Sequence, residues 1–88
     1  MSAEIETAIF ELLGKAAPGK SISPEEVARA VDPLAWRRLL GHVRAVARGL
    51  ARQRRLVITR HGKPADPEDF KGVYRLRAPP AETQGENA

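Results

Sequence analysis

The chain has 88 residues, 42% of them hydrophobic, which is enough for one compact domain with a single core but not for two. It contains no cysteine, which excludes disulfides, thiolate metal sites and a cysteine nucleophile, and fits a reducing cytoplasm. Residues 33–65 hold eight arginines, one lysine and no acidic residue, a net charge of +9, whereas the segments on both sides are net acidic. Such a local positive field attracts polyanions.

A first helix is predicted over residues 3–16. Ile5, Ile9 and Leu12 recur there at helical spacing, and Ser2 suits the N-cap position. This N-terminus lacks the basic and then apolar layout of a signal peptide. We therefore expect a cytoplasmic protein that begins with a helix.

A short extended segment is expected at residues 20–22, followed by a second helix over 24–31. Ser23 is a good N-cap, Pro24 suits the first helical position, and Glu26 completes the pattern of a capping box. The start of the second helix is therefore well defined by the sequence.

A long third helix is predicted over residues 34–54, joined to the second by the short turn Asp32-Pro33, as in a helix-turn-helix. At about 100° per residue, its aliphatic side chains and Trp36 gather on one side and its arginines on the other. We therefore expect Trp36 to pack in the core rather than stack on a base. The outward stripe consists of Arg37, Arg44, Arg48 and Arg52, with Arg38 at its flank.

Two strands, residues 56–60 and 72–77, are predicted to form a hairpin around a loop of about ten residues. The first part of the loop is basic and the second part, residues 66–69, is acidic; residues 61–69 look too polar for a strand. As a wing on DNA, the loop would use its basic part, but an exposed loop with internally paired charges is slightly favoured. Residues 78–88 lack large apolar side chains and are expected to be a disordered tail.

This order of elements predicts an α+β, winged-helix-like domain over residues 1–77. Several motifs also match a known family, and they are Ser23-Pro24-Glu25-Glu26-Val27-Ala28-Arg29, Trp36-Arg37, Val43-Arg44, Leu50, Thr59-Arg60-His61-Gly62-Lys63 and Gly72-Val73-Tyr74-Arg75-Leu76-Arg77. Through them, residues 4–77 resemble a bacterial family of small winged-helix-like domains of unknown function. The resemblance implies the fold but no activity, substrate or cofactor. Winged-helix domains mostly bind DNA, and a minority bind protein or RNA, but fold alone does not fix function.

No catalytic constellation is legible in the sequence. There is no Ser–His–Asp pattern, no paired-carboxylate arrangement, no phosphate-cradling glycine loop and no dinucleotide fingerprint. His42 and His61, the two histidines, have no neighbour at metal-ligand spacing. We therefore expect neither an enzyme nor a metal or cofactor site.

The leading hypothesis is a module that binds double-stranded DNA with the third helix in the major groove, and a transcriptional regulator is one form that this hypothesis takes. Its candidate contacts are Arg37, Arg38, Arg44, Arg48, Arg52, Arg60 and Lys63. Three alternatives stay open: RNA as the ligand, a protein-interaction module with an acidic partner, and a merely solvated arginine face partly paired with Glu11, Glu25 or Glu26. A monomer or weak homodimer is expected. No membrane association is expected, because no apolar run approaches about 20 residues.

Overall fold

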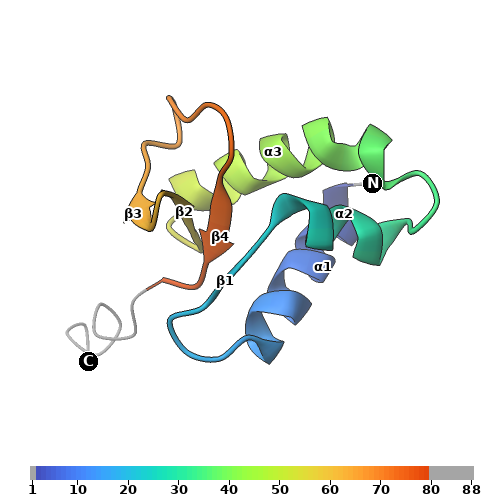
Figure 1. Ribbon diagram of the computed structural model, residues 1–88, viewed down its shortest axis with the longest axis horizontal. Helices are drawn as coiled ribbons and strands as arrows, with labels where there is room; N and C mark the ends of the chain where they lie inside the picture. The colour runs from blue at the N-terminus through green and yellow to red at the C-terminus, as the bar shows by residue number, and fades with distance from the viewer. Residues whose placement is uncertain (1, 80–88) are drawn as a thin grey trace.

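The computed structural model describes residues 2–79 as three helices and a four-stranded antiparallel sheet (Figure 1). In chain order the elements are α1 (Ser2–Lys15), β1 (Ser21–Ile22), α2 (Pro24–Val31), α3 (Trp36–Arg52), β2 (Val57–Arg60), β3 (Lys63–Pro64) and β4 (Arg75–Arg77). This confirms the predicted α+β class and is compatible with a winged-helix-like fold. Ser2, expected to cap α1, is instead its first residue. Most of the expected tail, residues 80–88, lies outside the described residues.

The start of α2 follows the capping box that the sequence predicts. The Ser23 hydroxyl accepts a hydrogen bond from the Glu26 N–H at 3.1 Å, and the Ser23 N–H donates to the Glu26 carboxylate at 2.8 Å. Two backbone donors at the helix end are thereby satisfied. The observed bounds of α2 agree with the predicted ones.

The third helix is shorter than predicted at its N-terminus. One carboxylate oxygen of Asp32 accepts hydrogen bonds from the N–H groups of Leu34 at 3.0 Å and Ala35 at 3.1 Å. This side-chain contact holds residues 33–35 in a turn, so α3 begins at Trp36 rather than at residue 34. Aspartate commonly captures the backbone in this way, in competition with helix formation.

The C-terminus of α3 also comes two residues earlier than predicted. Arg54 adopts a left-handed conformation with φ 62°. Its N–H donates to the Ala51 carbonyl at 3.0 Å, and the Arg55 N–H donates to the Leu50 carbonyl at 2.9 Å. This pair of bonds is a Schellman motif, which ends the helix at Arg52. An arginine occupies the position at which glycine is usual, so the residue types in this segment did not predict that α3 ends at Arg52.

The sheet has the strand order β1-β4-β2-β3. The expected extended segment is confirmed as β1, in which Ile22 pairs with Leu76 of β4, while β4 pairs with β2. The expectation of one uninterrupted loop between two strands is wrong, because Lys63–Pro64 pairs with β2 as β3. A two-residue turn with positive φ at His61 (54°) and Gly62 (80°) makes this short hairpin. Proline is tolerated in β3 because it is an edge strand, where a missing N–H breaks no ladder.

The core lies between the helices and one face of the sheet. Its most deeply buried side chains come from all three helices and from β2 and β4: Ile5, Ile9, Val27, Val43, Ile58 and Leu76. Tyr74, predicted to belong to the core together with Leu76, is buried at 6% exposure. Because one side of α3 packs in this core, the opposite side of the helix is available for other contacts.

Candidate nucleic-acid interface

The first turn of α3 exposes two adjacent arginines. Arg37 and Arg38 both lie on the surface, and no acidic residue lies in this turn. The N-cap residue, Ala35, offers no side-chain acceptor to the backbone N–H groups. Cations beside the positive end of a helix dipole repel it, whereas an anion at this end is stabilised. The Asp32 carboxylate already accepts hydrogen bonds just before this end, so it is the charge of the two exposed arginines that suits the first turn of α3 to an anionic partner.

Trp36 organises the surface beside this turn. The guanidinium carbons of Arg29 and Arg37 lie 4.5 Å and 4.4 Å from the centre of its ring. Arg29 is also paired with Glu25 of α2 at 2.8 Å. Trp36 packs against the core, as predicted, but it is only half-buried and also carries two cations on its ring. These contacts restrict Arg37 to the corner between α2 and α3.

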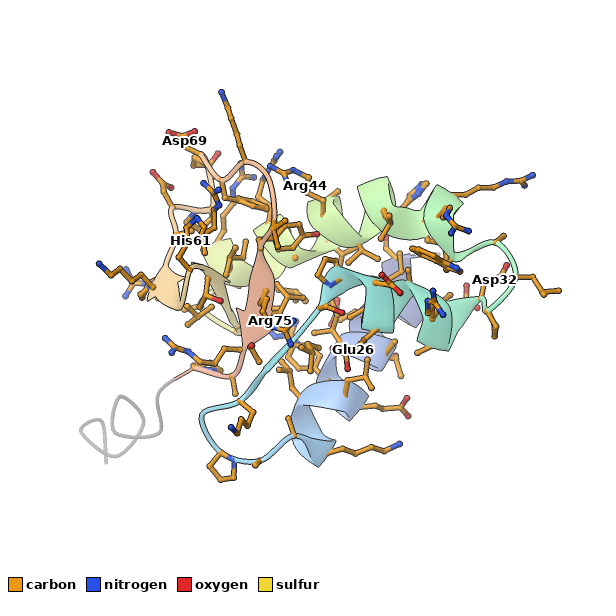
Figure 2. All side chains as sticks on the ribbon, viewed as in Figure 1. Glu26, Asp32, Arg44, His61, Asp69 and Arg75 are labelled. Atoms are coloured by element: carbon orange, nitrogen blue, oxygen red, sulfur yellow. The ribbon has the colours of Figure 1, made fainter. Side chains whose placement is uncertain are left out.

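The middle of the predicted arginine stripe is covered. The β3–β4 loop, residues 65–74, folds over α3, and Phe70 inserts from it to 2% exposure. The Arg44 guanidinium donates a hydrogen bond to the Phe70 carbonyl oxygen and lies 4.0 Å from the centre of the Phe70 ring. Figure 2 shows Arg44 extending from α3 toward the loop that carries Asp69 at its tip. Arg44 thus anchors the loop instead of facing solvent freely.

The C-terminal end of the stripe is paired with the same loop. Arg52 makes a two-pronged contact with Glu68, of which the bond from Nη2 to Oε1 is 2.6 Å long. This hydrogen bond from Arg52 lowers the pKa of the Glu68 carboxyl, and the positive charge of Arg48 contributes in the same direction. Arg48 is half-buried beside Phe70, and its Nε has no hydrogen-bond partner among the described residues.

The remaining two candidates belong to the sheet. Arg60 donates to the Val73 carbonyl at 3.3 Å, and its Nη2 would lie 3.3 Å from a Cβ added to Gly72. Gly72 also has φ +74°, so both conformation and space favour glycine there. Lys63 is exposed on β3, which lies toward the C-terminal end of α3, away from Arg37 and Arg38 (Figure 1).

The predicted site is therefore divided into parts. Arg44, Arg52 and Arg60 hold the β3–β4 loop, and Arg48 lies next to Phe70. Arg37, Arg38 and Lys63 are exposed. The stripe predicted along α3 is not uniformly open, because loop residues far away in the sequence contact Arg44 and Arg52 and Arg48 is half-buried.

Glu25 and Glu26, considered from the sequence as partners of the arginine stripe, pair instead with Arg29 at 2.8 Å and Arg75 at 3.8 Å. Arg52 pairs with Glu68 of the loop, and Arg55 pairs with Glu6 of α1 at 3.1 Å. Sequence reasoning missed Phe70 as the residue that attaches the loop to α3. Phe70 is the one large apolar side chain in residues 61–72, a pattern that could have identified it.

Other kinds of site can be checked directly in residues 2–79. No three histidine, aspartate or glutamate side chains in this range are placed to hold a metal ion. Within the same range, no helix is long and apolar enough to cross a membrane.

Comparison with curated proteins finds no match to this chain. Comparison with family models does find one, and it extends over every residue described above. The matching model is that of the family called Protein of unknown function (DUF3253), and it covers residues 2–79. The chain therefore belongs to the DUF3253 family.

Proposed function

We propose that the domain binds double-stranded DNA through the N-terminal half of α3, with Arg37 and Arg38 as its principal contacts. The observation that carries this proposal is the exposed arginine pair in the first turn of α3, in a helix with no acidic residue. In a helix-turn-helix, the N-terminal residues of the second helix contact base edges in the major groove. α2, a short turn and α3 follow one another in the same order along this chain, which supports the proposal.

The outer surface of α3 would allow close approach to DNA. Gly41 and Ala45 follow Arg37 at four-residue intervals, so all three share one face of the helix, and all are exposed. A Cβ built on Gly41 would meet nothing within 4 Å. With 17 residues, α3 is about 25 Å long, and a helix of ordinary diameter fits the major groove.

The finer form of the proposal is a bacterial winged-helix regulator of transcription that acts in the cytoplasm. The absence of cysteine is consistent with that compartment. Few exposed arginines on a single small domain would give mainly phosphate contacts, so a monomer would bind duplexes weakly and with little preference for sequence. Recognition of a defined site would then require a second copy or a second domain.

Charge removal at two positions tests the proposal. Fluorescence anisotropy of a labelled mixed-sequence duplex of about 25 base pairs would be followed at about 50 mM and about 200 mM salt. Replacing Arg37 and Arg38 by alanine is expected to weaken binding more than tenfold at the lower salt. Replacing Lys15 and Lys20 by alanine removes the same charge from exposed positions at the end of α1 and directly before β1, and should change affinity less than about threefold. Equal losses in both double variants would contradict the proposal.

A second candidate function is the docking of an acidic protein. Leu34 is 96% exposed in the turn that precedes Arg37 and Arg38. A large exposed aliphatic side chain beside cations suits a partner with a small apolar contact and an acidic rim. This candidate would be favoured if the domain does not bind duplex DNA at low salt but binds an acidic protein, and if Leu34→Ser abolishes that binding.

A further inference from the structure

The contact between Arg52 and Glu68 has the form of a phosphate contact. Nε and Nη2 of Arg52 both donate to the carboxylate, one to each oxygen. Arginine binds phosphate with the same planar, two-pronged geometry. Both side chains are more than half exposed, at 54% and 56%, so a ligand in solvent can reach the contact.

A second arginine acts on the same position. Arg48 precedes Arg52 by one helical turn, so the two share a face of α3. The charge of Arg48 helps to lower the pKa of Glu68, which means that its field reaches the carboxylate. The Nε of Arg48 is itself buried and has no partner among the described residues, so Arg48 contributes its positive charge to this position rather than a hydrogen bond from Nε.

The loop holds Glu68 near the arginines. The Glu68 N–H donates to the Asp66 carboxylate at 2.9 Å, and the Asp69 N–H donates to the Asp66 carbonyl at 2.9 Å. Phe70, buried two residues after Glu68, attaches this turn to α3. A tethered carboxylate has a high effective concentration at its partner, so it competes well with a weak external anion.

We propose that Arg52, together with Arg48, forms a phosphate subsite on α3, and that Glu68 occupies this subsite in the free protein as an internal competitor. A backbone phosphate of DNA displaces the carboxylate, while Phe70 remains seated. This inference rests on the proposed function, since the displacing ligand is the nucleic acid bound at Arg37 and Arg38. Glu68 thereby limits how strongly the domain holds DNA.

The Glu68→Gln variant tests this displacement, with Glu6→Gln as its matched control. Glu6 is also an exposed partner of an arginine, Arg55, so its replacement changes net charge equally and frees one arginine as well. Using the same duplex, Glu68→Gln is expected to raise affinity about fivefold at low salt, the order of one exposed ion pair. Because the same phosphate is contacted in both complexes, the slope of log K against log salt should change by less than about 0.9, the value for one whole phosphate contact.

A second substitution shows whether the gain passes through Arg52. In an Arg52→Gln background, Glu68→Gln should change affinity no more than Glu6→Gln does. Circular dichroism would confirm that each variant is folded, and Glu68→Ala replaces Glu68→Gln if the glutamine disturbs the loop. The Nε–H resonance of Arg52 gives a direct readout, since it should shift when DNA is added to the wild type.

The outcomes separate the two proposals. If the wild type binds the duplex but Glu68→Gln behaves like Glu6→Gln, the subsite proposal is overturned and the proposed function stands. If a gain in Glu68→Gln persists in the Arg52→Gln background, the subsite is likewise overturned. If no variant binds at low salt, the proposed function and the subsite fall together.

Discussion

Arginines on one helix face have different environments in this domain. Arg37 stacks on Trp36, Arg44 bonds to and packs on Phe70, Arg52 pairs with Glu68, and Arg38 is exposed. Periodicity places all of them away from the core, but it does not distinguish these contacts. A count of arginines therefore overestimates how many can meet a ligand without rearrangement.

The role of Arg44 as a loop anchor predicts a loss of stability on its removal. Arg44→Ala deletes a cation–π contact and leaves the Phe70 carbonyl without its donor. We expect the free energy of unfolding to fall by about 1–3 kcal/mol. Urea denaturation would measure it, with Arg38→Ala as the control, expected to stay within about 0.5 kcal/mol of the wild type. Equal stability of the two variants would show that Arg44 does not hold the loop.

The buried phenol of Tyr74 predicts that the wild type loses stability at alkaline pH. Burial raises the pKa of its phenol, partly offset by the charge of Arg44. A pKa raised by folding means that the stability present below the ordinary value, about 10, is lost as pH rises through the folded value. Tyr74→Phe removes this loss, and also removes a buried hydroxyl that has no partner among residues 2–79. The urea midpoint of Tyr74→Phe should therefore match or exceed that of the wild type at about pH 8, and should exceed it by more at about pH 11. A larger alkaline loss in Tyr74→Phe would be the contrary result.

At the scale of elements, the strongly patterned segments were predictable, as were the ends of α2, but the ends of α3 were not. The capping box of α2 and the amphipathic pattern of α3 are local features of the sequence, and both are confirmed. The ends of α3 depend on the side chain of Asp32 and on a left-handed Arg54, neither of which changes the hydrophobic pattern. β3 has two residues, one of them proline, so no alternation could reveal it.

The turn before β3 yields a prediction at this scale. His61 and Gly62 both have positive φ, a conformation that asparagine adopts more readily than histidine and that glycine adopts without strain. His61→Asn should therefore leave stability equal or higher by up to about 0.5 kcal/mol, while Gly62→Ala should lower it by about 1 kcal/mol. Since a Cβ at Gly62 meets nothing within 4 Å, any loss reports conformation rather than collision. An unchanged Gly62→Ala variant would argue against this turn.

On the scale of the whole molecule, the basic surface could be predicted from the sequence, but the packing of the β3–β4 loop against it could not. The +9 segment and the separation of charged from apolar faces are properties of residues 33–65 alone. The position of this loop depends on contacts between residues that are 26 positions apart, as for Arg44 and Phe70, and 16 apart, as for Arg52 and Glu68. Such contacts follow from the packing of the loop on α3, which no local pattern encodes.

The molecule thus combines an open cationic end with a covered one. Arg37 and Arg38 mark the open end, and the acidic turn of the β3–β4 loop lies at the covered end. Under the proposed function, binding begins at the open end, and further contacts require exchange of the Glu68 carboxylate. Affinity and its salt dependence would therefore report on both ends at once.

The most direct test of the central claim is the salt dependence of wild-type binding to a mixed-sequence duplex, followed by fluorescence anisotropy. We predict micromolar or tighter affinity at about 50 mM salt, and a slope of log K against log salt that is at least as steep as about −1.8, because Arg37 and Arg38 contribute about −0.9 each. No binding at this salt concentration, or binding that salt does not weaken, would contradict the claim that α3 is a DNA-binding helix.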